Sequence, residues 1–386
     1  MDYFLSEEQL ELQKLTRKIA QEKVKPVAAQ FDQSGEFPWD LVKLFGELDL
    51  FRVFIEEEFG GIGGGVLDLS IVTEELSRAC GGIAICLAAS ALGSFPITLF
   101  GTPEQKQKYL PSLADGTTLA GFCLTEAEAG SDVSAMKTKA VKDGDHYILN
   151  GTKHFITNGS VANVYTIIAS TDPSKGSRGA SAFIVDDTMP GLSFGKKEDK
   201  MGIRASVTSE VVLQDCIVPA SNRIGNEGQG FLIAMKTLDR SRPGVAAQAV
   251  GIAQGALDLA VEYARQRTQF EQPIASFQGI QFMLADMATQ IEAARALVYA
   301  TARMVDANVK NIGKESAMCK LFASDVAMKV TTDAVQIFGG YGYMKDYPIE
   351  KYMRDAKITQ IYEGTNQIQR QVIARSLIRE YAGKNS

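Results

Sequence analysis

The residues that could most directly do chemistry lie late in the chain, in the segment 361–370 (IYEGTNQIQR). Glu363 stands there between an aromatic ring, Tyr362, and Gly364, just ahead of a stretch rich in amide side chains. A carboxylate beside apolar surface loses solvation, so its pKa rises towards the range of a useful general base. Gly364 would leave room for a substrate carbonyl to approach the backbone. The alternative is an ordinary glutamate in the first turn of a helix, where the helix dipole favours it.

A second candidate is the polar segment 122–132 (FCLTEAEAGSD). Backbone amides freed by Gly130, together with the hydroxyls of Thr125 and Ser131, could hold a planar heterocycle and a phosphate. The alternative is a polar loop built around an Asx turn. The segment is therefore compatible with a cofactor site without requiring one.

Three further motifs have both a functional and a structural interpretation. Phe155 and Thr157 fall on one face of a strand, which suits stacking on a ring, although a core phenylalanine is preferred when the motif is taken alone. Arg267, followed by Gln278, could bind a pyrophosphate or cap a helix C-terminus. The glycines within 336–343 could admit a ligand or simply end a helix. No G-x-G-x-x-G follows a strand and no Walker-type loop is present, which argues against the usual nucleotide-binding folds.

Bulk properties restrict the class of protein. The chain has 386 residues, is 45% hydrophobic and 22% charged, and carries a formal net charge of -6, without the basic field of a nucleic-acid binder. Its five scattered cysteines fit buried thiols in a reducing compartment better than a disulfide framework, and we assign no metal site. The N-terminus lacks a basic region followed by an apolar run, and we interpret no segment as long and apolar enough to span a bilayer. We therefore expect a cytoplasmic protein without membrane insertion.

Three regimes of sequence pattern must position the candidate residues. From Ser6 to about Gly116 the pattern is helical, and Ser6 with Gln9 forms a capping box. The first predicted helix carries an apolar stripe at Leu10, Leu12, Leu15 and Ile19.

The middle of the chain, about 119–224, changes to short β-branched runs, which indicates a compact antiparallel β domain. Asn150-Gly151 lies between two such runs and is the strongest short-range signal for a hairpin. After Gly225 the helical pattern returns, and frequent alanine and glycine permit close packing as in a bundle. The helices are expected over 231–267, 277–309, 314–338 and 366–382. The domains are expected to span 1–118, 119–225 and 226–386.

The order and spacing of these motifs over essentially the whole chain resemble the acyl-CoA dehydrogenase family. The segments 200–206 (KMGIRAS) and 354–358 (RDAKI) also resemble signatures of that family. The resemblance implies an α+β fold with an N-terminal helical domain, a middle antiparallel β domain and a C-terminal four-helix bundle. It further implies an FAD-dependent enzyme that assembles as a homotetramer.

The resemblance also implies roles for individual residues. Those expected to line the FAD are Phe122, Leu124, Thr125, Gly130, Ser131, Phe155, Ile156 and Thr157. Those expected to reach the FAD of a neighbouring subunit are Arg267, Phe270, Gln278, Gln336, Gly339 and Gly340. Thr365 and Gln367 are expected to close over the adenylate part of the cofactor. Those expected at the acyl-CoA substrate are Ser131, Asp239, Arg242 and Gly364.

By the same resemblance, Glu363 matches the catalytic base. It would remove the pro-R α-proton of an acyl thioester while the β-hydrogen leaves as hydride to the flavin. The backbone N–H of Glu363 and a ribityl hydroxyl would polarise the thioester carbonyl. The product would be a trans-2-enoyl-CoA, with the electrons passed to an electron-transfer flavoprotein. Some relatives carry the base on the helix containing 239–242, but Ser241 cannot serve here.

The sequence departs from the family pattern at several positions. Ala127 stands where a proline is usual, and Phe155 where a tryptophan is usual, which removes an indole donor. Glu271 and Gln272 replace a commoner Gly-Lys pair, which leaves the geometry of that loop open. These departures affect the surroundings of the cofactor rather than the proposed base.

The helix that walls the acyl pocket in relatives matches 83–96 here. That segment contains no arginine or lysine and many small side chains. We therefore expect a short, branched or cyclic acyl group rather than a dicarboxylyl one. Two alternatives stay open: an acyl-CoA oxidase that admits oxygen to the flavin, and a DNA-associated member of the superfamily with little activity. The acidic balance and moderate length of the chain argue against both.

Overall fold

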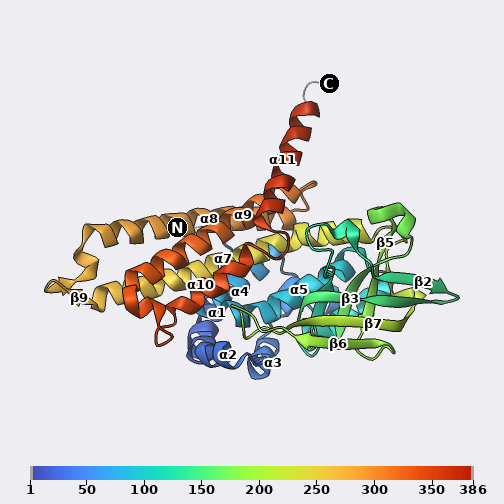
Figure 1. The fold of residues 1–386 in the computed structure, drawn as a ribbon, viewed down its shortest axis with the longest axis horizontal. Helices are drawn as coiled ribbons and strands as arrows, with labels where there is room; N and C mark the ends of the chain where they lie inside the picture. Colours follow the sequence, from blue (N-terminus) through green and yellow to red (C-terminus); the bar gives the residue numbers. More distant parts are fainter. Residues whose placement is uncertain (1–2, 384–386) are drawn as a thin grey trace.

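The computed structural model describes residues 3–383 and consists of a helical N-terminal part, a β-sheet domain and a long helical C-terminal part (Figure 1). The sheet domain lies at one end of the long axis, and the C-terminal helices extend towards the other. The N-terminal helices are α1 (Glu7–Ile19), α2 (Ala28–Ser34), α3 (Trp39–Glu47), α4 (Val66–Ala79), α5 (Gly81–Phe100) and α6 (Pro103–Ala114).

The first helix begins as predicted but buries a different face. The capping box is present, since Ser6 accepts from the N–H of Gln9 and the Gln9 side chain accepts from the N–H of Ser6. Leu10 and Leu15 of the predicted stripe are 41% and 43% exposed, whereas Ile19 is buried. The predicted stripe was therefore wrong in part, because the residues that α1 buries are Thr16 and Ile19, in its second half.

The middle domain is one eight-stranded sheet with strand order β6-β7-β3-β2-β4-β5-β8, and β1 pairs with β4. Most pairings are antiparallel, as predicted, but β1 and β2 each pair in parallel with β4. The strands are β1 (Ala120–Cys123), β2 (Lys139–Asp143), β3 (His146–Thr157), β4 (Val164–Ser170), β5 (Ala180–Asp186), β6 (Leu192–Lys197), β7 (Thr208–Pro219) and β8 (Arg223–Ile224).

The hairpin predicted at Asn150-Gly151 does not exist. Both residues lie inside the single 12-residue strand β3, where the register with β7 shifts between Leu149 and Gly151. Asn150 Nδ2 donates to Asp215 Oδ1 of β7 at 3.0 Å, and Asn150 Oδ1 accepts from the backbone N–H of Asp215 at 2.8 Å. A Cβ at Gly151 would lie 2.4 Å from Thr138 Oγ1, so glycine is required here by close approach rather than by a turn.

The C-terminal helices follow the predicted periods closely, with one addition. They are α7 (Gly230–Gln266), α8 (Gln278–Asp306), α9 (Gly313–Phe338), α10 (Ile349–Thr359) and α11 (Asn366–Gly383). The short helix α10 was not predicted, and a small ribbon, β9 (Thr268–Gln269) with β10 (Gln272–Pro273), joins α7 to α8. Helices α7, α8 and α9 pack against one another, α10 packs against α7 and α9, and α11 packs against α9 before its end projects from the body of the molecule (Figure 1).

Small residues bring α7 against α4, which fixes the long helix that carries part of the site. A Cβ at Gly251 would lie 2.2 Å from Glu74 O, and one at Gly255 would lie 2.2 Å from Arg78 O. The two backbones can therefore approach only because both residues are glycine, as expected for close helix packing.

One sequence expectation about membranes was wrong. The helices α5 and α7 are long and apolar enough to cross a bilayer by length and composition. In both, 78% of the apolar window is buried inside the protein. The core helix of a globular domain passes the same test, so the apolar length of these helices is explained by packing.

Candidate active site

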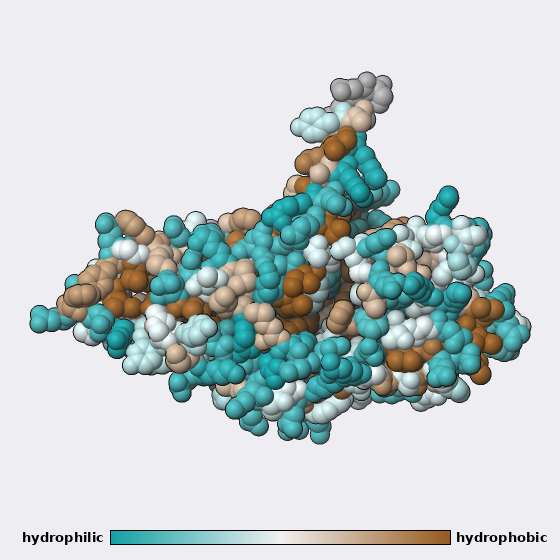
Figure 2. All heavy atoms as spheres, in the orientation of Figure 1, coloured by the Kyte–Doolittle hydropathy of each residue, from teal (hydrophilic) through white to brown (hydrophobic). Residues whose placement is uncertain are grey.

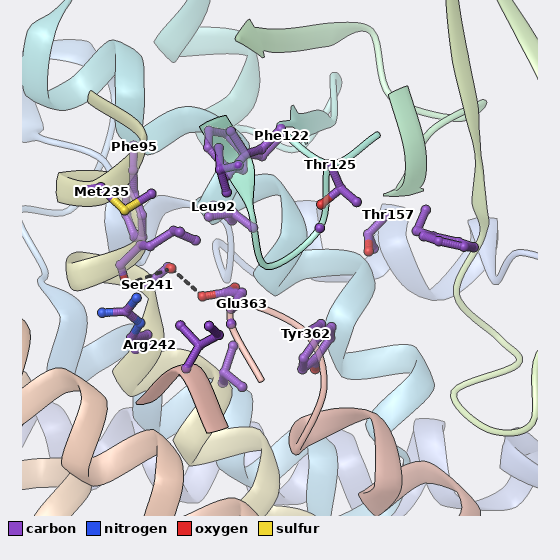
Figure 3. Close-up of a pocket in the computed structure, with 18 of the residues that line it drawn as sticks. Leu92, Phe95, Phe122, Thr125, Thr157, Met235, Ser241, Arg242, Tyr362 and Glu363 are labelled. Atoms are coloured by element: carbon purple, nitrogen blue, oxygen red, sulfur yellow. Dashed lines mark hydrogen bonds between the residues drawn. The ribbon is translucent and has the colours of Figure 1, made fainter. Parts of the chain in front are cut away.

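The residues expected at the active site converge on one cavity of about 370 Å³. It is bounded by α5, α7, the loop after β1, the end of β3 and the turn that precedes α11 (Figure 3). The sequence-predicted residues that line it are Phe122, Leu124, Thr125, Gly130, Ser131, Phe155, Ile156, Thr157, Arg242, Glu363 and Gly364.

Glu363 sits on a left-handed turn just before α11. Its φ is +51° and that of Gly364 is +90°, so the segment is not the first turn of a helix. Gly364 lines the cavity, and its φ lies in the left-handed region that favours glycine. The N–H groups of Glu363 and Gly364 donate to no acceptor within the described residues, and they remain available to a ligand.

Burial sets the acidity of Glu363. Desolvation raises the pKa of its carboxyl, and this effect outweighs the hydrogen bond from Ser241 and the charges of Arg242 and Lys320, all of which lower it. Ser241 Oγ lies 2.5 Å from Glu363 Oε2 and 3.2 Å from Leu238 O. The Ser241 hydroxyl donates to Glu363 and so favours the ionised carboxylate, but burial has the larger effect and leaves the pKa of Glu363 raised.

Two helices form the apolar wall of the cavity. Residues of α7 face it at helical spacing, with Met235 and Leu238 followed by Arg242. Arg242 is only 4% exposed and pairs with Asp239 at 2.8 Å, so its charge is already compensated. The residues contributed by α5 are Ile85, Ala88, Ala89, Leu92 and Phe95. The wall thus offers apolar surface with small side chains and no free cation.

The opposite wall has the properties of a site for a planar heterocycle. The hydroxyls of Thr125, Ser131 and Thr157 face the cavity and have no hydrogen-bond partner in the part of the chain that the structure describes. The Phe155 ring is 61% exposed at a bulge where its φ is +57°. A Cβ at Gly130 would meet nothing within 4 Å. Unpartnered hydroxyls beside open space and an exposed ring fit a heteroaromatic cofactor.

A buried ion pair fixes the loop that carries the Thr125 and Ser131 hydroxyls. Lys153 is fully buried, and its Nζ donates to Glu126 Oε1 at 2.7 Å and to Leu124 O at 3.1 Å. The Glu126 carboxylate also accepts from the N–H groups of Lys137 and Thr138. The loop is therefore anchored to β3 through its own side chains.

Other sequence-predicted residues lie away from this cavity. A second, shallower hollow of about 520 Å³ lies beside the β9–β10 ribbon, and Arg267, Gly339 and Gly340 line it. Phe270 is 88% exposed at the tip of the ribbon. Asp239 reaches the site only through its pair with Arg242. The remaining predicted residues stand elsewhere: Thr365 accepts from the N–H of Ile368 at the start of α11, and Gln278, Gln336 and Gln367 are exposed.

Sequence reasoning missed the side chains that hold the turn. Lys320 on α9 and Gln369 on α11 are fully buried and donate to carbonyls of the turn. A signal for Lys320 was present, since it falls at helical spacing among small residues that the structure buries. Those residues of α9 are Ala317, Ser324, Ala327 and Thr331. A lysine within such a stripe indicates a buried polar contact.

Known proteins resemble the chain over nearly its full length. Family models for the N-terminal, middle and C-terminal domains of acyl-CoA dehydrogenases match residues 6–117, 121–216 and 228–378. A short-chain specific acyl-CoA dehydrogenase of Clostridium acetobutylicum is 49% identical, over 98% of this chain and 100% of its own. Butyryl-CoA dehydrogenase of Megasphaera elsdenii has a TM-score of 0.95 and 49% identity, covering 98% and 100% of the two chains.

A further solved structure links the fold to electron transfer. The structure described as the electron transferring flavoprotein of Acidaminococcus fermentans, studied for flavin-based electron bifurcation, contains a chain with a TM-score of 0.96. That chain is 51% identical, over 98% of this chain and 100% of its own. The family uses FAD, which the hydroxyl-lined wall of the cavity fits. The chain therefore belongs to the acyl-CoA dehydrogenase family of FAD-dependent oxidoreductases.

Proposed function

We propose that the protein oxidises a short-chain acyl-CoA thioester to the trans-2-enoyl-CoA, with Glu363 as the base. The observation that carries this proposal is the position of the Glu363 carboxyl, which lines the cavity between the hydroxyl-bearing wall and the apolar wall. Burial raises the pKa of this carboxyl, as a general base near neutral pH requires. The catalytic and cofactor roles of the named residues rest on this arrangement together with the family membership.

In the proposed reaction, the chain's own groups bind, orient and deprotonate the substrate. The apolar wall of α5 and α7 takes the acyl chain and excludes water. The free N–H of Glu363 donates to the thioester carbonyl, which makes the α-proton more acidic. Glu363 then accepts the α-proton from the substrate. FAD, when bound against Thr125, Ser131 and Thr157, supplies the acceptor for the β-hydride.

The proposal extends to partners and assembly. We propose an electron-transfer flavoprotein as the electron acceptor, a homotetramer as the assembly, and a cytoplasmic location. Exposed apolar side chains support the assembly, since Phe270 is 88% exposed and Ile378 of α11 is 69% exposed. Hydrophobic residues are also visible on the projecting part of α11 (Figure 2). In such an assembly, Arg267, Phe270, Gln278 and 336–340 would reach a neighbour's cofactor, and Thr365 and Gln367 would close over its adenylate. The domain boundaries 118/119 and 225/226 belong to the same proposal.

The substrate class is tested by anaerobic titration of the flavin spectrum with a panel of acyl-CoA thioesters. We expect butyryl-CoA, or a branched or cyclic analogue, to bleach the oxidised flavin band. Glutaryl-CoA is expected to react at least about tenfold more slowly, because its second carboxylate would be buried without a free counter-ion. Faster bleaching by glutaryl-CoA would contradict the short apolar substrate, while a yellow protein that no thioester bleaches would contradict the reaction.

The two alternative functions give different results in simple assays. For an oxidase, air would reoxidise the substrate-reduced flavin at the rate of turnover, whereas we expect slow reoxidation here. For a DNA-associated protein, duplex DNA would be retained at low salt. We expect no retention from a chain with a net charge of -6.

Removal of the Ser241 hydroxyl tests its influence on the base. The bond from Ser241 lowers the pKa of Glu363, so Ser241→Ala is expected to raise that pKa further. Because the base acts when deprotonated, the rising limb of flavin reduction against pH should move to higher pH. At pH 6 we expect reduction to be about tenfold slower, in line with one hydrogen bond to a charged group.

The matched control is Ser94→Ala. Ser94 is also buried, on α5, and among the described residues its hydroxyl donates only to the carbonyl of Ala91, at 2.8 Å. The pH profile of this control should stay unchanged. A Ser241→Ala profile identical to that of the parent would mean that this hydroxyl does not influence the base.

A further inference from the structure

One buried cation near the site, Lys320, forms no ion pair with any residue that the structure describes. Lys320 is fully buried on α9, and its Nζ donates to Gly364 O at 2.8 Å and to Asn366 Oδ1 at 2.9 Å. The other two fully buried or nearly buried lysines each pair with a carboxylate, Lys153 with Glu126 and Lys351 with Asp355. Among the described residues, Lys320 forms no ion pair and bonds only neutral acceptors.

Stability alone does not explain this lysine. An ammonium taken from water without a counter-ion is unfavourable, and an apolar side chain of similar volume would often be more stable in its place. Burial accordingly lowers the pKa of Lys320 to about 7, although the nearby charges of Glu363 and Asp325 oppose the shift. The benefit must therefore lie in what the ammonium holds, which is the turn at 363–364.

That turn needs to be held. Glu363 is a non-glycine residue with a φ of +51°, a conformation that costs roughly 1 kcal/mol or more unless its surroundings impose it. Gln369 Nε2 donates to the carbonyls of both Glu363 and Gly364, at 3.0 and 2.9 Å, but Gln369 belongs to the helix that the turn itself begins. Lys320 is the donor that comes from α9, so it ties the turn to the helical bundle.

On the basis of the proposed function, we propose that Lys320 is a positioning residue of the dehydrogenation, which holds the 363–364 turn so that the Glu363 carboxylate and its free N–H both face the substrate. The lysine does not line the cavity and does not contact the substrate. It acts through the Gly364 carbonyl, one residue from the base.

The position of Lys320 also affects the charge of the base. The groups that face it are Glu363 on the turn, Arg242 on α7 and Asp325 on α9. The positive charge of Lys320 lowers the pKa of Glu363. Loss of this charge is therefore expected to raise the pKa of Glu363 and to move the rising limb of flavin reduction to higher pH.

The test uses Lys320→Met in the full-length holoenzyme, with flavin content and melting temperature as checks of folding. We expect FAD to stay bound, the apparent dissociation constant for butyryl-CoA to change little, and the limiting rate of flavin reduction to fall about 100-fold, as a displacement of about 1 Å can produce. Lys320→Gln, which keeps a donor but no charge, should recover part of the rate and none of the pH shift.

Lys329→Met is the control, because Lys329 lies on the same helix in an exposed pair with Asp333. An unchanged limiting rate and pH profile in Lys320→Met would overturn the proposal, and if that variant does not fold, the same result in Lys320→Gln would do so. A crystal structure of the variant gives a readout that is independent of substrate. If the 363–364 turn has not moved and Glu363 still bonds Ser241, the positioning role is contradicted. If no thioester bleaches the flavin of the parent protein, only the proposed function is contradicted.

Discussion

Replacement of Glu363 by glutamine is expected to leave the protein yellow with bound FAD and to abolish flavin reduction by an acyl-CoA thioester. Glutamine has the same shape and can still accept a hydrogen bond from Ser241, so the 363–364 turn and the cavity should persist. It cannot accept the α-proton, and loss of a positioned base slows proton transfer by about 10²–10⁴-fold. Rapid-mixing measurement of flavin bleaching under anaerobic conditions checks this result.

Two further variants make the test of Glu363 specific. Glu315→Gln is the control, because Glu315 is a partly buried carboxylate at the start of α9 whose one ion pair within residues 3–383 is with Lys314. Its flavin should be reduced at the parental rate. Glu363→Asp keeps the charge but shortens the side chain, so we expect an intermediate rate. Normal reduction in Glu363→Gln would mean that another group accepts the proton.

Helix boundaries were the part of the fold that local sequence determined best. The predicted helices 231–267 and 314–338 end within one residue of α7 and α9, because an apolar stripe of helical period persists over their whole length. Asn150-Gly151 gave the opposite result. Its local preference for a turn was overridden by pairing with β7 and by the close approach of Thr138, and neither contact is visible in a short window of sequence.

The residues that line the site could be predicted from the sequence, but the contacts that hold them in place could not. Resemblance to a family placed Glu363, Thr125 and Thr157, and the structure brings them to one cavity. The contacts that tune Glu363 come from far along the chain, since Ser241 is 122 residues away. Such contacts depend on how α7 packs against the turn, which no local pattern encodes. Gly364 was predicted for substrate approach, and its φ of +90° adds a conformational reason for glycine that the sequence alone does not reveal.

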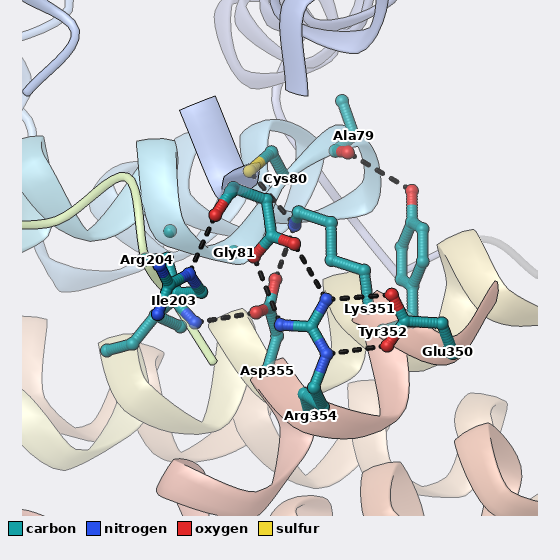
Figure 4. Close-up of polar contacts among 12 residues, drawn as sticks. Ala79, Cys80, Gly81, Ile203, Arg204, Glu350, Lys351, Tyr352, Arg354 and Asp355 are labelled. Atoms are coloured by element: carbon teal, nitrogen blue, oxygen red, sulfur yellow. Dashed lines mark hydrogen bonds and ion pairs between the residues drawn. The ribbon is translucent and has the colours of Figure 1, made fainter. Parts of the chain in front are cut away.

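Two sequence signatures, 200–206 and 354–358, have a common structural explanation. They meet where α10 contacts the loop after the sheet strand β6 (Figure 4). Asp355 Oδ1 accepts from the N–H of Ile203 at 2.6 Å, and a Cβ at Gly202 would lie 2.4 Å from Arg354 O. Arg354 also forms a bidentate pair with Asp32 of α2. The network thus joins the N-terminal helices, the sheet domain and α10, which leads into the 363–364 turn.

Of the substitutions proposed for this protein, Asp355→Asn is expected to lower the free energy of unfolding the most. Lys351 and Asp355 form a buried pair, with 2.5 Å between Nζ and Oδ2, so the substitution leaves a buried ammonium without a counter-ion. Removal of one partner from such a pair costs about 3–5 kcal/mol, and the melting temperature should fall by at least about 5 °C. Asp333→Asn is the control, since Lys329–Asp333 has the same i,i+4 spacing in a more exposed setting and should contribute at most about 1 kcal/mol.

The dependence of this loss on pH separates an unpaired charge from simple repacking. In the parent, burial lowers the pKa of Lys351, but Asp355 more than compensates and raises it above its usual value. Without that carboxylate, burial should place the pKa of Lys351 below that of the unfolded chain. The folded variant then binds fewer protons than the unfolded chain, so its stability rises with pH up to the unfolded value of about 10.4. Melting curves of Asp355→Asn and the parent should therefore converge from pH 7 towards pH 10, whereas a gap independent of pH would indicate lost packing instead.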